Sequence, residues 1–369
     1  MIRTLAITVL WGSTAFAGAV LAAPDPTVLS RSIDNAAPKK AKERDPALVA
    51  KAEILLDRAH VSPGEIDGLD GDNFHNAVRA FQQVNSLPIS RDLDAATWGA
   101  LMRDGAPILK AYTITLADAA GRFTRAIPSN LEGMARLPGL SYTSAQSELA
   151  EKFHMSPTLL RELNPRADFA RAGTELSVAN VPEMLLRSGR PSVEAVPPPN
   201  PPKAKNDLPE VTIVVDKPAR NLRVYDRDGK FLAATIGSEE KPAPSGDFKV
   251  KGVSWNPKYE YDPKFAWKGV NTKRKLSIGP GPNNPVGLVW IDLTDPTYGI
   301  HGTPAPSDIG KTQSHGCTRL TNWDAVELAG MVRPGDVVRF DDQDSPVAPS
   351  AETAPVGETQ PPELSRRGP

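Results

Sequence analysis

Apolar residues recur at helical spacing in the first third of the chain and alternate with polar residues in its last third. Within residues 45–104, three apolar stripes with spacings of three and four residues predict three short helices. Asp45 is a favourable N-cap with Pro46 at the first helical position, and Asp94 is placed to begin the third helix. From residue 210 to 340 the period changes to two, which predicts strands. We therefore expect a multidomain protein in which a small helical bundle precedes a mainly β domain.

A second small unit is predicted between the bundle and the β domain, at residues 140–181. Ser144 and Ser156 are each placed to cap a short helix, and residues 173–178 have the composition of a strand. The preceding residues, 105–139, are predicted to be a connector with one candidate strand. These elements indicate a small α+β unit.

The β domain carries its own strand and turn signals. Val211, Ile213 and Val215 alternate with their neighbours, and the Asp228-Gly229 pair between two alternating runs predicts a hairpin. Further strands are expected at 248–253, 288–293 and 337–340, and one helix at 322–331.

Proline accounts for 37 of the 369 residues, about twice the average share, while 40% of the residues are hydrophobic. Folded units joined by stiff linkers explain both numbers. Seven of the 22 residues in 188–209 are proline and none is aromatic, so 182–209 is predicted to be an extended linker. Residues 24–44 are expected to be a mobile lead-in, and residues 341–369, which also lack aromatic residues, a disordered tail.

The N-terminus has the pattern of a secretory signal peptide, in which a basic start (Arg3) precedes an apolar run and small residues. Val20 and Ala22 suit the small positions of one cleavage site, and cleavage after Ala23 is an alternative. An uncleaved anchor is the other interpretation, but the run contains polar residues and glycines and is short for the ~20 residues of a membrane span. We therefore expect residues 1–23 to be removed on export, which leaves no stable membrane span.

Charge and cysteine content exclude several classes of function. The 43 basic and 44 acidic side chains give a net charge of −1, so no global field attracts nucleic acid or an anionic membrane. The single cysteine excludes an intrachain disulfide framework and a cysteine-rich zinc site.

That cysteine, Cys317, lies close in sequence to two of the five histidines. His301 precedes it by 16 residues and His315 by two, with Gly316 between. A thiolate nucleophile needs a neighbouring base or cation, and histidine is suited to that work near neutral pH. An adjacent glycine lets backbone amides approach an oxyanion closely. The pattern therefore indicates nucleophilic catalysis by Cys317.

Three other interpretations stay open from the residues alone. Cys317 would also suit a small buried core position, as many free cysteines do. His301, His315 and Cys317 would also suit zinc, although a closed structural site takes four ligands and no fourth is evident. The histidines would also suit ordinary loop positions.

The motifs around these residues resemble those of a known family. His-Gly-Thr at 301–303, followed by Ser-His-Gly-Cys-x-Arg at 314–319, resembles the YkuD-type L,D-transpeptidase family. Pro-x-Gly-x-Phe at 244–248 and Asn-Pro-Val-Gly at 284–287 agree with it. The resemblance covers residues 210–340 and implies a mainly β catalytic domain.

Two N-terminal segments resemble cell-wall-binding modules. Residues 46–104 resemble the peptidoglycan-binding-domain-1 family of three-helix modules, through Asp67-Gly68, Ala77-Val78-x-x-Phe81-Gln82 and Leu93-Asp94-x-x-Thr97-Trp98. Residues 140–181 are similar to a degenerate LysM glycan-binding module, because the Gly-Asp normally found before the first helix is absent. The first resemblance implies contact with peptidoglycan, while glycan binding and a retained structural spacer both stay open for the second unit.

The catalytic resemblance assigns roles to individual residues. Cys317 is implied as the nucleophile, His301 as its general base and His315 as a residue that orients substrate or nucleophile, although which histidine takes the proton stays open. Backbone amides of Gly316 and Cys317 are implied as oxyanion donors. The remaining motif positions are implied to support the site: Gly302, Thr303, Ser314, and Arg319, which would bind a substrate carboxylate or form a structural ion pair.

By the same resemblance the reaction is cross-linking of peptidoglycan in the periplasm, with peptide stems as partners and no metal or organic cofactor. The cysteine attacks the third-residue carbonyl of a tetrapeptide stem, releases D-alanine, and passes the acyl group to an amine, giving a 3→3 cross-link. Acylation of the cysteine by carbapenems is also implied. Hydrolysis by an L,D-carboxypeptidase, anchoring of a protein to peptidoglycan, and a non-catalytic wall-binding protein are the alternatives.

Overall fold

The computed structural model describes residues 28–38, 45–184, 210–236, 245–265, 272–295, 298–311 and 317–342. The predicted signal peptide, most of the predicted linker and nearly all of the predicted tail lie outside the described residues. So do three predicted site residues, Ser314, His315 and Gly316.

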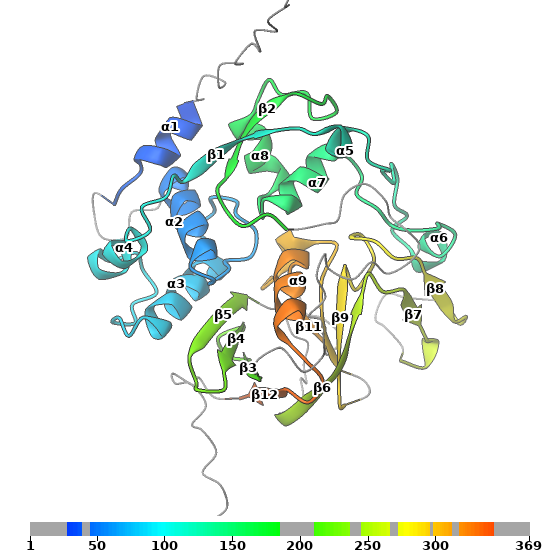
Figure 1. Ribbon diagram of the computed structural model, residues 1–369. Helices are drawn as coiled ribbons and strands as arrows, with labels where there is room; N and C mark the ends of the chain where they lie inside the picture. The colour runs from blue at the N-terminus through cyan, green and yellow to red at the C-terminus, as the bar shows by residue number, and fades with distance from the viewer. Residues whose placement is uncertain are drawn as a thin grey trace, which may run out of the picture.

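The N-terminal part is helical, and its predicted three-helix bundle is confirmed (Figure 1). Asp45 caps the first bundle helix by accepting a hydrogen bond from the amide of Ala47, and Asp94 caps the third by accepting from Thr97. The helices are α1 (Val28–Asn35), α2 (Pro46–Arg58), α3 (Asp72–Val84) and α4 (Ala95–Leu101).

Helix α1 corrects the expectation that residues 24–44 form a mobile lead-in. Its Ile33 is completely buried, and the Lys51 ammonium on α2 donates hydrogen bonds to the carbonyls of Asp34 (2.8 Å) and Ala36 (3.0 Å). Those carbonyls lie at the C-terminal end of α1, where a cation is favourable. Residues 24–44 were expected to be mobile because they are mostly polar, and composition does not show that Ile33 becomes buried.

The second unit contains four helices between two paired strands. Ser144 and Ser156 cap α7 and α8 as predicted. Its first strand, β1, lies within the predicted connector and pairs antiparallel with β2, Leu109 opposite Ala179. The elements are β1 (Leu109–Thr113), α5 (Leu116–Ala119), α6 (Leu131–Met134), α7 (Ala145–Lys152), α8 (Pro157–Leu163) and β2 (Glu175–Ala179). The two capped helices and the strand after them agree with the predicted α+β unit, while its LysM-like identity stays a prediction.

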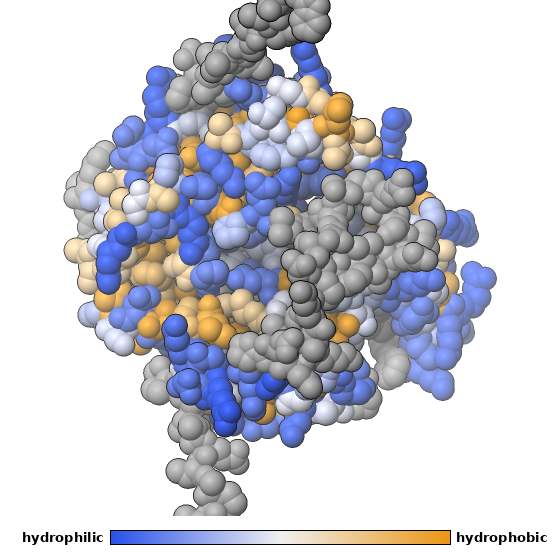
Figure 2. Space-filling view, viewed as in Figure 1, coloured by the Kyte–Doolittle hydropathy of each residue, from blue (hydrophilic) through white to orange (hydrophobic). Residues whose placement is uncertain are grey.

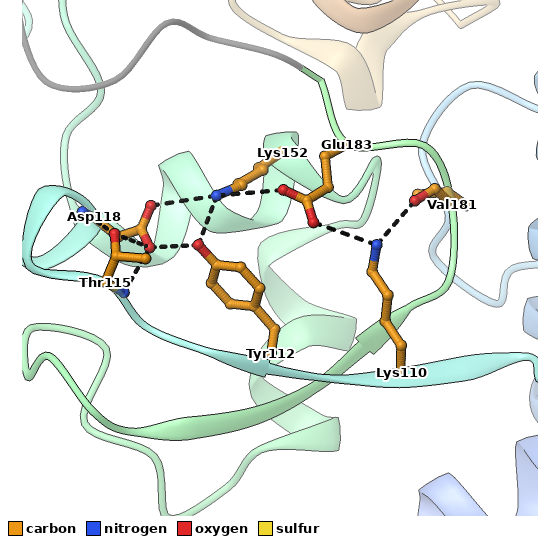
Figure 3. A network of polar contacts seen from close by, with 7 residues as sticks. All are labelled: Lys110, Tyr112, Thr115, Asp118, Lys152, Val181 and Glu183. Atoms are coloured by element: carbon orange, nitrogen blue, oxygen red, sulfur yellow. Dashed lines mark hydrogen bonds and ion pairs between the residues drawn. The ribbon is translucent and has the colours of Figure 1, made fainter.

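A polar network braces this unit (Figure 3). The Lys152 ammonium on α7 donates to the phenol oxygen of Tyr112 on β1 (2.6 Å), and that phenol donates to Asp118 (2.6 Å). Lys152 also approaches Glu183, which pairs with Lys110 (3.5 Å). Burial opposes ionisation of Asp118, but the donors around it and the Lys152 charge lower its pKa overall. The network holds together β1, α5, α7 and the segment after β2.

The bundle and the second unit share one hydrophobic core, although the sequence predicted them as separate modules. A single cluster contains buried residues from Ile33 to Val181. Backbone hydrogen bonds join the two parts, because Ile66 donates to the His154 carbonyl (2.8 Å) and Ser156 donates to Ile66 (2.9 Å). We refer to residues 28–184 as the N-terminal module.

The C-terminal part is built on an eight-stranded sheet with the order β11-β10-β9-β6-β12-β3-β4-β5. Neighbouring strands are antiparallel except for β12 with β3 and β10 with β11. Its core packs against α9. The sheet strands are β3 (Val211–Asp216), β4 (Asn221–Asp226), β5 (Phe231–Ile236), β6 (Gly246–Trp255), β9 (Val289–Leu293), β10 (Gly299–His301), β11 (Thr318–Arg319) and β12 (Val337–Asp341).

The remaining elements complete the catalytic range. The hairpin β7 (Tyr259–Tyr261) and β8 (Leu276–Ile278) forms a separate two-stranded sheet near α6. Short 3-10 helices occupy Pro263–Phe265 and Pro306–Asp308, and α9 spans Asn322–Met331. The predicted hairpin, the three later strands and the helix are confirmed, the helix to the residue.

The N-terminal module lies against the sheet domain along several elements (Figure 1). Helix α3 contacts β5, α7 contacts α9, and α6 contacts β8. Leu140 donates its amide to the Pro280 carbonyl (2.7 Å) and accepts from Asn283 (3.0 Å). On the face shown in Figure 2, apolar surface gathers over α3 and β5, whereas the surface over β7 and β8 is hydrophilic.

Candidate active site

Strand β10 places His301 between two neighbouring strands. His301 lies opposite Trp290 on antiparallel β9 and opposite Arg319 on parallel β11. Its imidazole is buried and stacks on the Trp290 indole, with 5.5 Å between ring centroids and 16° between planes. The ring is therefore held in one orientation by packing.

One hydrogen bond defines which nitrogen of His301 carries the proton. Nδ1 lies 2.6 Å from the carbonyl oxygen of Gly302, and a carbonyl only accepts, so Nδ1 is the donor. In the neutral ring Nε2 then has a free lone pair. Burial lowers the pKa of His301 to about 4, with the Arg319 charge adding to this effect and the Gly302 bond opposing it. At neutral pH the ring is an uncharged potential proton acceptor.

Cys317 comes directly before β11 and is partly exposed. Cys317 lies two residues before Arg319, the β11 residue that pairs with His301. Partial exposure speaks against the interpretation of Cys317 as an inert core residue. A thiol in this position is accessible to a substrate.

Tyr259 on β7 lies within electrostatic range of Cys317. Burial raises the pKa of its phenol, and the Cys317 charge raises it further. Sequence reasoning did not single out Tyr259, because the only signal is an aromatic alternation, Tyr259 and Tyr261, in a short stretch between prolines. The β7–β8 hairpin thus contributes to the surroundings of the thiol.

Asn322 lies against the backbone of two motif segments, the one at Gly287 and the one that follows His301. The sequence pattern marks it only as the first residue of a helix. Its Oδ1 accepts from the amide of Leu288 (3.0 Å). A Cβ on Gly302 would lie 2.2 Å from that oxygen, and one on Gly287, which has a φ of +62°, would lie 2.1 Å from it. Glycine is therefore required at both motif positions. No local pattern could reveal Asn322, because its partners are 20 and more residues away in sequence.

Two other predicted site residues, Thr303 and Arg319, lie in the loop after His301 and on the strand beside it. Thr303 is buried, and its hydroxyl accepts from the Ala305 amide (3.2 Å), which shapes the loop after His301. Arg319 is half-buried opposite His301. The structure thus places Gly302 and Arg319 beside His301 and Cys317 two residues before Arg319, while Ser314, His315 and Gly316 lie outside the described residues.

The described residues contain neither a candidate metal site nor a candidate membrane-spanning helix. In the described ranges, no three His, Cys, Asp or Glu residues are grouped so as to hold a metal ion. Nor does any helix there have the length and apolarity needed to cross a membrane.

Two family models match the chain. One, described as an L,D-transpeptidase catalytic domain, matches residues 210–340. The other, described as a putative peptidoglycan binding domain, matches residues 46–101. Both matches fall on the segments for which the sequence predicted these families.

Relatives and a solved structure carry the same family name. "Putative L,D-transpeptidase YkuD" of Bacillus licheniformis is 34% identical over 125 residues, which are 33% of this chain and 61% of the relative. A solved L,D-transpeptidase from Mycobacterium smegmatis aligns with 24% identity over 36% of this chain and 59% of that one, with a TM-score of 0.29. "Putative L,D-transpeptidase YqjB" of Bacillus subtilis is 31% identical over 150 residues, which are 38% of this chain. Because that match covers 77% of the relative, the chain belongs to the YkuD-type L,D-transpeptidase family.

Proposed function

We propose that this protein is a peptidoglycan L,D-transpeptidase that uses Cys317 as its nucleophile and His301 as its base. The observation that carries the proposal is the parallel pairing of β10 with β11. It sets Arg319 opposite His301, and Cys317 lies two residues before Arg319, which supports the assignment of His301 and Cys317 as base and nucleophile. His301 is held as a neutral ring with its proton on Nδ1, so that Nε2 is available to accept a proton.

In the proposed acylation step the Cys317 thiol proton moves to His301 Nε2 while the sulfur attacks the third-residue carbonyl of a tetrapeptide stem. The carbon–sulfur bond forms, and the negative charge goes to the carbonyl oxygen. Backbone amides of Gly316 and Cys317 are the proposed donors to that oxyanion. The bond to D-alanine then breaks, and its amine leaves with the proton held by His301. A thioester on Cys317 results.

The second step transfers the acyl group. The side-chain amine of a diamino acid on another stem attacks the thioester, loses a proton to His301, and displaces the thiol. His315 is proposed to orient substrate or nucleophile, and Arg319 to bind a substrate carboxylate. Gly302, Thr303 and Ser314 are proposed to support the loop and strand around these groups. No organic cofactor or metal takes part in these steps.

The N-terminal module is proposed to act at the wall. A peptidoglycan-binding domain on the same chain as the enzyme raises the effective concentration of the enzyme at its polymeric substrate. Together with the predicted signal peptide, this places the proposed reaction in the periplasm.

Purified tetrapeptide muropeptides incubated with wild type and with Cys317→Ala test the proposal. We expect cross-linked dimers and free D-alanine from the wild type only. Tripeptide without dimers would identify hydrolysis instead. Acylation of a protein amine without formation of dimers would identify an anchoring enzyme. Equal product from both proteins would refute catalysis by Cys317, and no product from either would favour a wall-binding role.

A further inference from the structure

The loop that leaves His301 is attached to the N-terminal module as well as to its own domain. Ile309, in this loop, is 1% exposed and belongs to the hydrophobic cluster of the N-terminal module, not to that of the sheet. Among the described residues, it is the only fully buried member of that cluster from the range 210–340. An apolar side chain of the catalytic domain is thus a core residue of another module.

Two hydrogen bonds hold the loop backbone beside Ile309. The Asn73 side chain on α3 donates to the Ile309 carbonyl (2.8 Å), and the Arg220 guanidinium donates to the Gly310 carbonyl (2.7 Å). Gly310 has a φ of +74°, and a Cβ there would lie 2.0 Å from Asn73 Oδ1. The loop and α3 are therefore in close contact at this point.

The described part of the loop is internally ordered from His301 onwards. Thr303 accepts from the Ala305 amide, and the 3-10 turn at 306–308 is closed by the Ile309 amide donating to Pro306 (3.1 Å). On another side the loop borders a cavity of about 320 Å³, lined by Glu65, Asp67 and Lys311 among others. The Ile309 side chain and the two hydrogen bonds to loop carbonyls are thus anchors of this segment.

We propose that the N-terminal module positions the catalytic loop, with Ile309 and Asn73 as positioning residues that act through the chain between the base and the nucleophile. This inference rests on the proposed function. The described part of the loop runs from His301 on β10 to Lys311 without a break, so a shift at Ile309 is carried to the backbone that follows the proposed base. Small misplacements of reacting groups cost large factors in rate. The module therefore contributes to chemistry as well as to wall binding.

The test measures the reactivity of Cys317 in the full-length protein with two small probes. Carbapenem acylation, followed by intact mass, reports the catalytic arrangement, and alkylation by iodoacetamide reports the thiol itself. Ile309→Ala is expected to lower the acylation rate constant about tenfold or more. Asn73→Ala is expected to lower it about threefold or more, and Ile309→Val to restore most of the rate.

Ile114→Ala is the matched control. Ile114 is equally buried, at 1% exposure, and belongs to the same hydrophobic cluster, but it lies next to β1 and not in the loop. Ile114→Ala should lose about as much thermal stability as Ile309→Ala does. Its acylation rate should stay at the wild-type value. If Ile309→Ala fails to fold, Asn73→Ala decides.

Wild-type rates of acylation and alkylation in both Ile309→Ala and Asn73→Ala would overturn the inference, as would an equal loss in Ile114→Ala. Failure of the proposed function has a different signature. In that case the wild type itself forms no carbapenem adduct, and the alkylation rates still report whether the module positions Cys317.

Discussion

At the scale of single residues, His301 is kept uncharged by its surroundings. Burial removes the water that would stabilise an imidazolium, and the Arg319 charge disfavours it further. The Nδ1 bond to Gly302 fixes the tautomer, and the Trp290 stack fixes the ring plane. A neutral imidazole with a free Nε2 is able to accept the thiol proton in the proposed attack, so that step needs no preformed ion pair.

The acid side of the pH profile tests this assignment. His301 loses its ability to accept a proton as the pH falls through its pKa of about 4. The rate of carbapenem acylation should therefore stay level down to about pH 5 and decline below it. Mass spectrometry at each pH gives the rate, and circular dichroism shows that the protein stays folded. His301→Gln should reduce the plateau by about 10²–10⁴-fold and abolish this decline. A midpoint near pH 6.5, or a profile unchanged in His301→Gln, would contradict the assignment.

The sequence could predict His301 and Cys317 because their chemistry is rare and their motifs are local. The same motifs contain Gly287 and Gly302, but the reason for these glycines is the side chain of Asn322, which arrives from another segment. Asn322 also hydrogen-bonds the buried Glu151 of α7. Contacts of this kind depend on the folded sheet and leave no pattern in the sequence.

At the scale of elements, the N-terminus of α9 is a meeting point of the two parts of the molecule. Asp324 accepts hydrogen bonds from Thr321, the N-cap of α9, and from Thr235 on β5, both at 2.6 Å. Ser62 of the N-terminal module also donates to it (3.0 Å). Beside it, His154 stacks on Trp323 with 5.1 Å between ring centroids. Burial raises the pKa of Asp324 to about 7 despite its hydroxyl donors.

This buried carboxyl predicts a stability that depends on pH. The folded-state pKa of Asp324 is about 7 and that of an unfolded aspartate near ~4, so the folded protein binds more protons between these values. The free energy of unfolding must then fall as the pH rises from about 4 through 7. His154, whose pKa is also raised, acts in the same direction through pH 6.5 and above.

Asp324→Asn removes the titrating carboxyl group but keeps a side-chain oxygen that accepts hydrogen bonds from the neighbouring hydroxyls. We expect it to reduce the difference between the urea midpoints at pH 5.5 and pH 8, mainly by raising the midpoint at pH 8. Asp228→Asn, at an exposed position in the turn between β4 and β5, serves as the control. An undiminished difference in Asp324→Asn would show that its carboxyl does not titrate in this range.

Element prediction succeeded where the signal was long and failed where it was short. Helix α9 and the bundle helices have caps and several turns, and each was expected within a few residues. Strands β10 and β11 have three and two residues, too few for a period to appear. Helix α1 was missed because it becomes ordered through contact with α2, mainly by Ile33 and the Lys51 bonds.

At the scale of the whole molecule, the two parts are joined by buried polar groups as well as by the linker. Asp216 and Arg223 form a fully buried ion pair (2.9 Å) on β3 and β4, and Arg223 also donates to Gln83 on α3 (3.4 Å). Separation of α3 from the sheet would break this Arg223–Gln83 hydrogen bond, although the ion pair itself lies within the sheet. With the contacts at Ile309, Asp324 and Leu140, the interface extends over several elements. The sequence predicted independent modules on a stiff linker, since nothing in a proline count reveals that the modules dock.

Cutting the linker tests whether this docking persists without a covalent connection. A specific protease site inserted after Pro199, within the predicted linker, would allow complete cleavage under native conditions. We expect the two fragments to elute together in size-exclusion chromatography at micromolar concentration and to retain the carbapenem acylation rate of the intact chain. Ser62→Asp in the same background places a second carboxylate against buried Asp324 and should make the fragments separate after cleavage. Independent elution of the unsubstituted fragments would show that the linker alone holds the molecule together, and the wall-binding module would then act only as a tether.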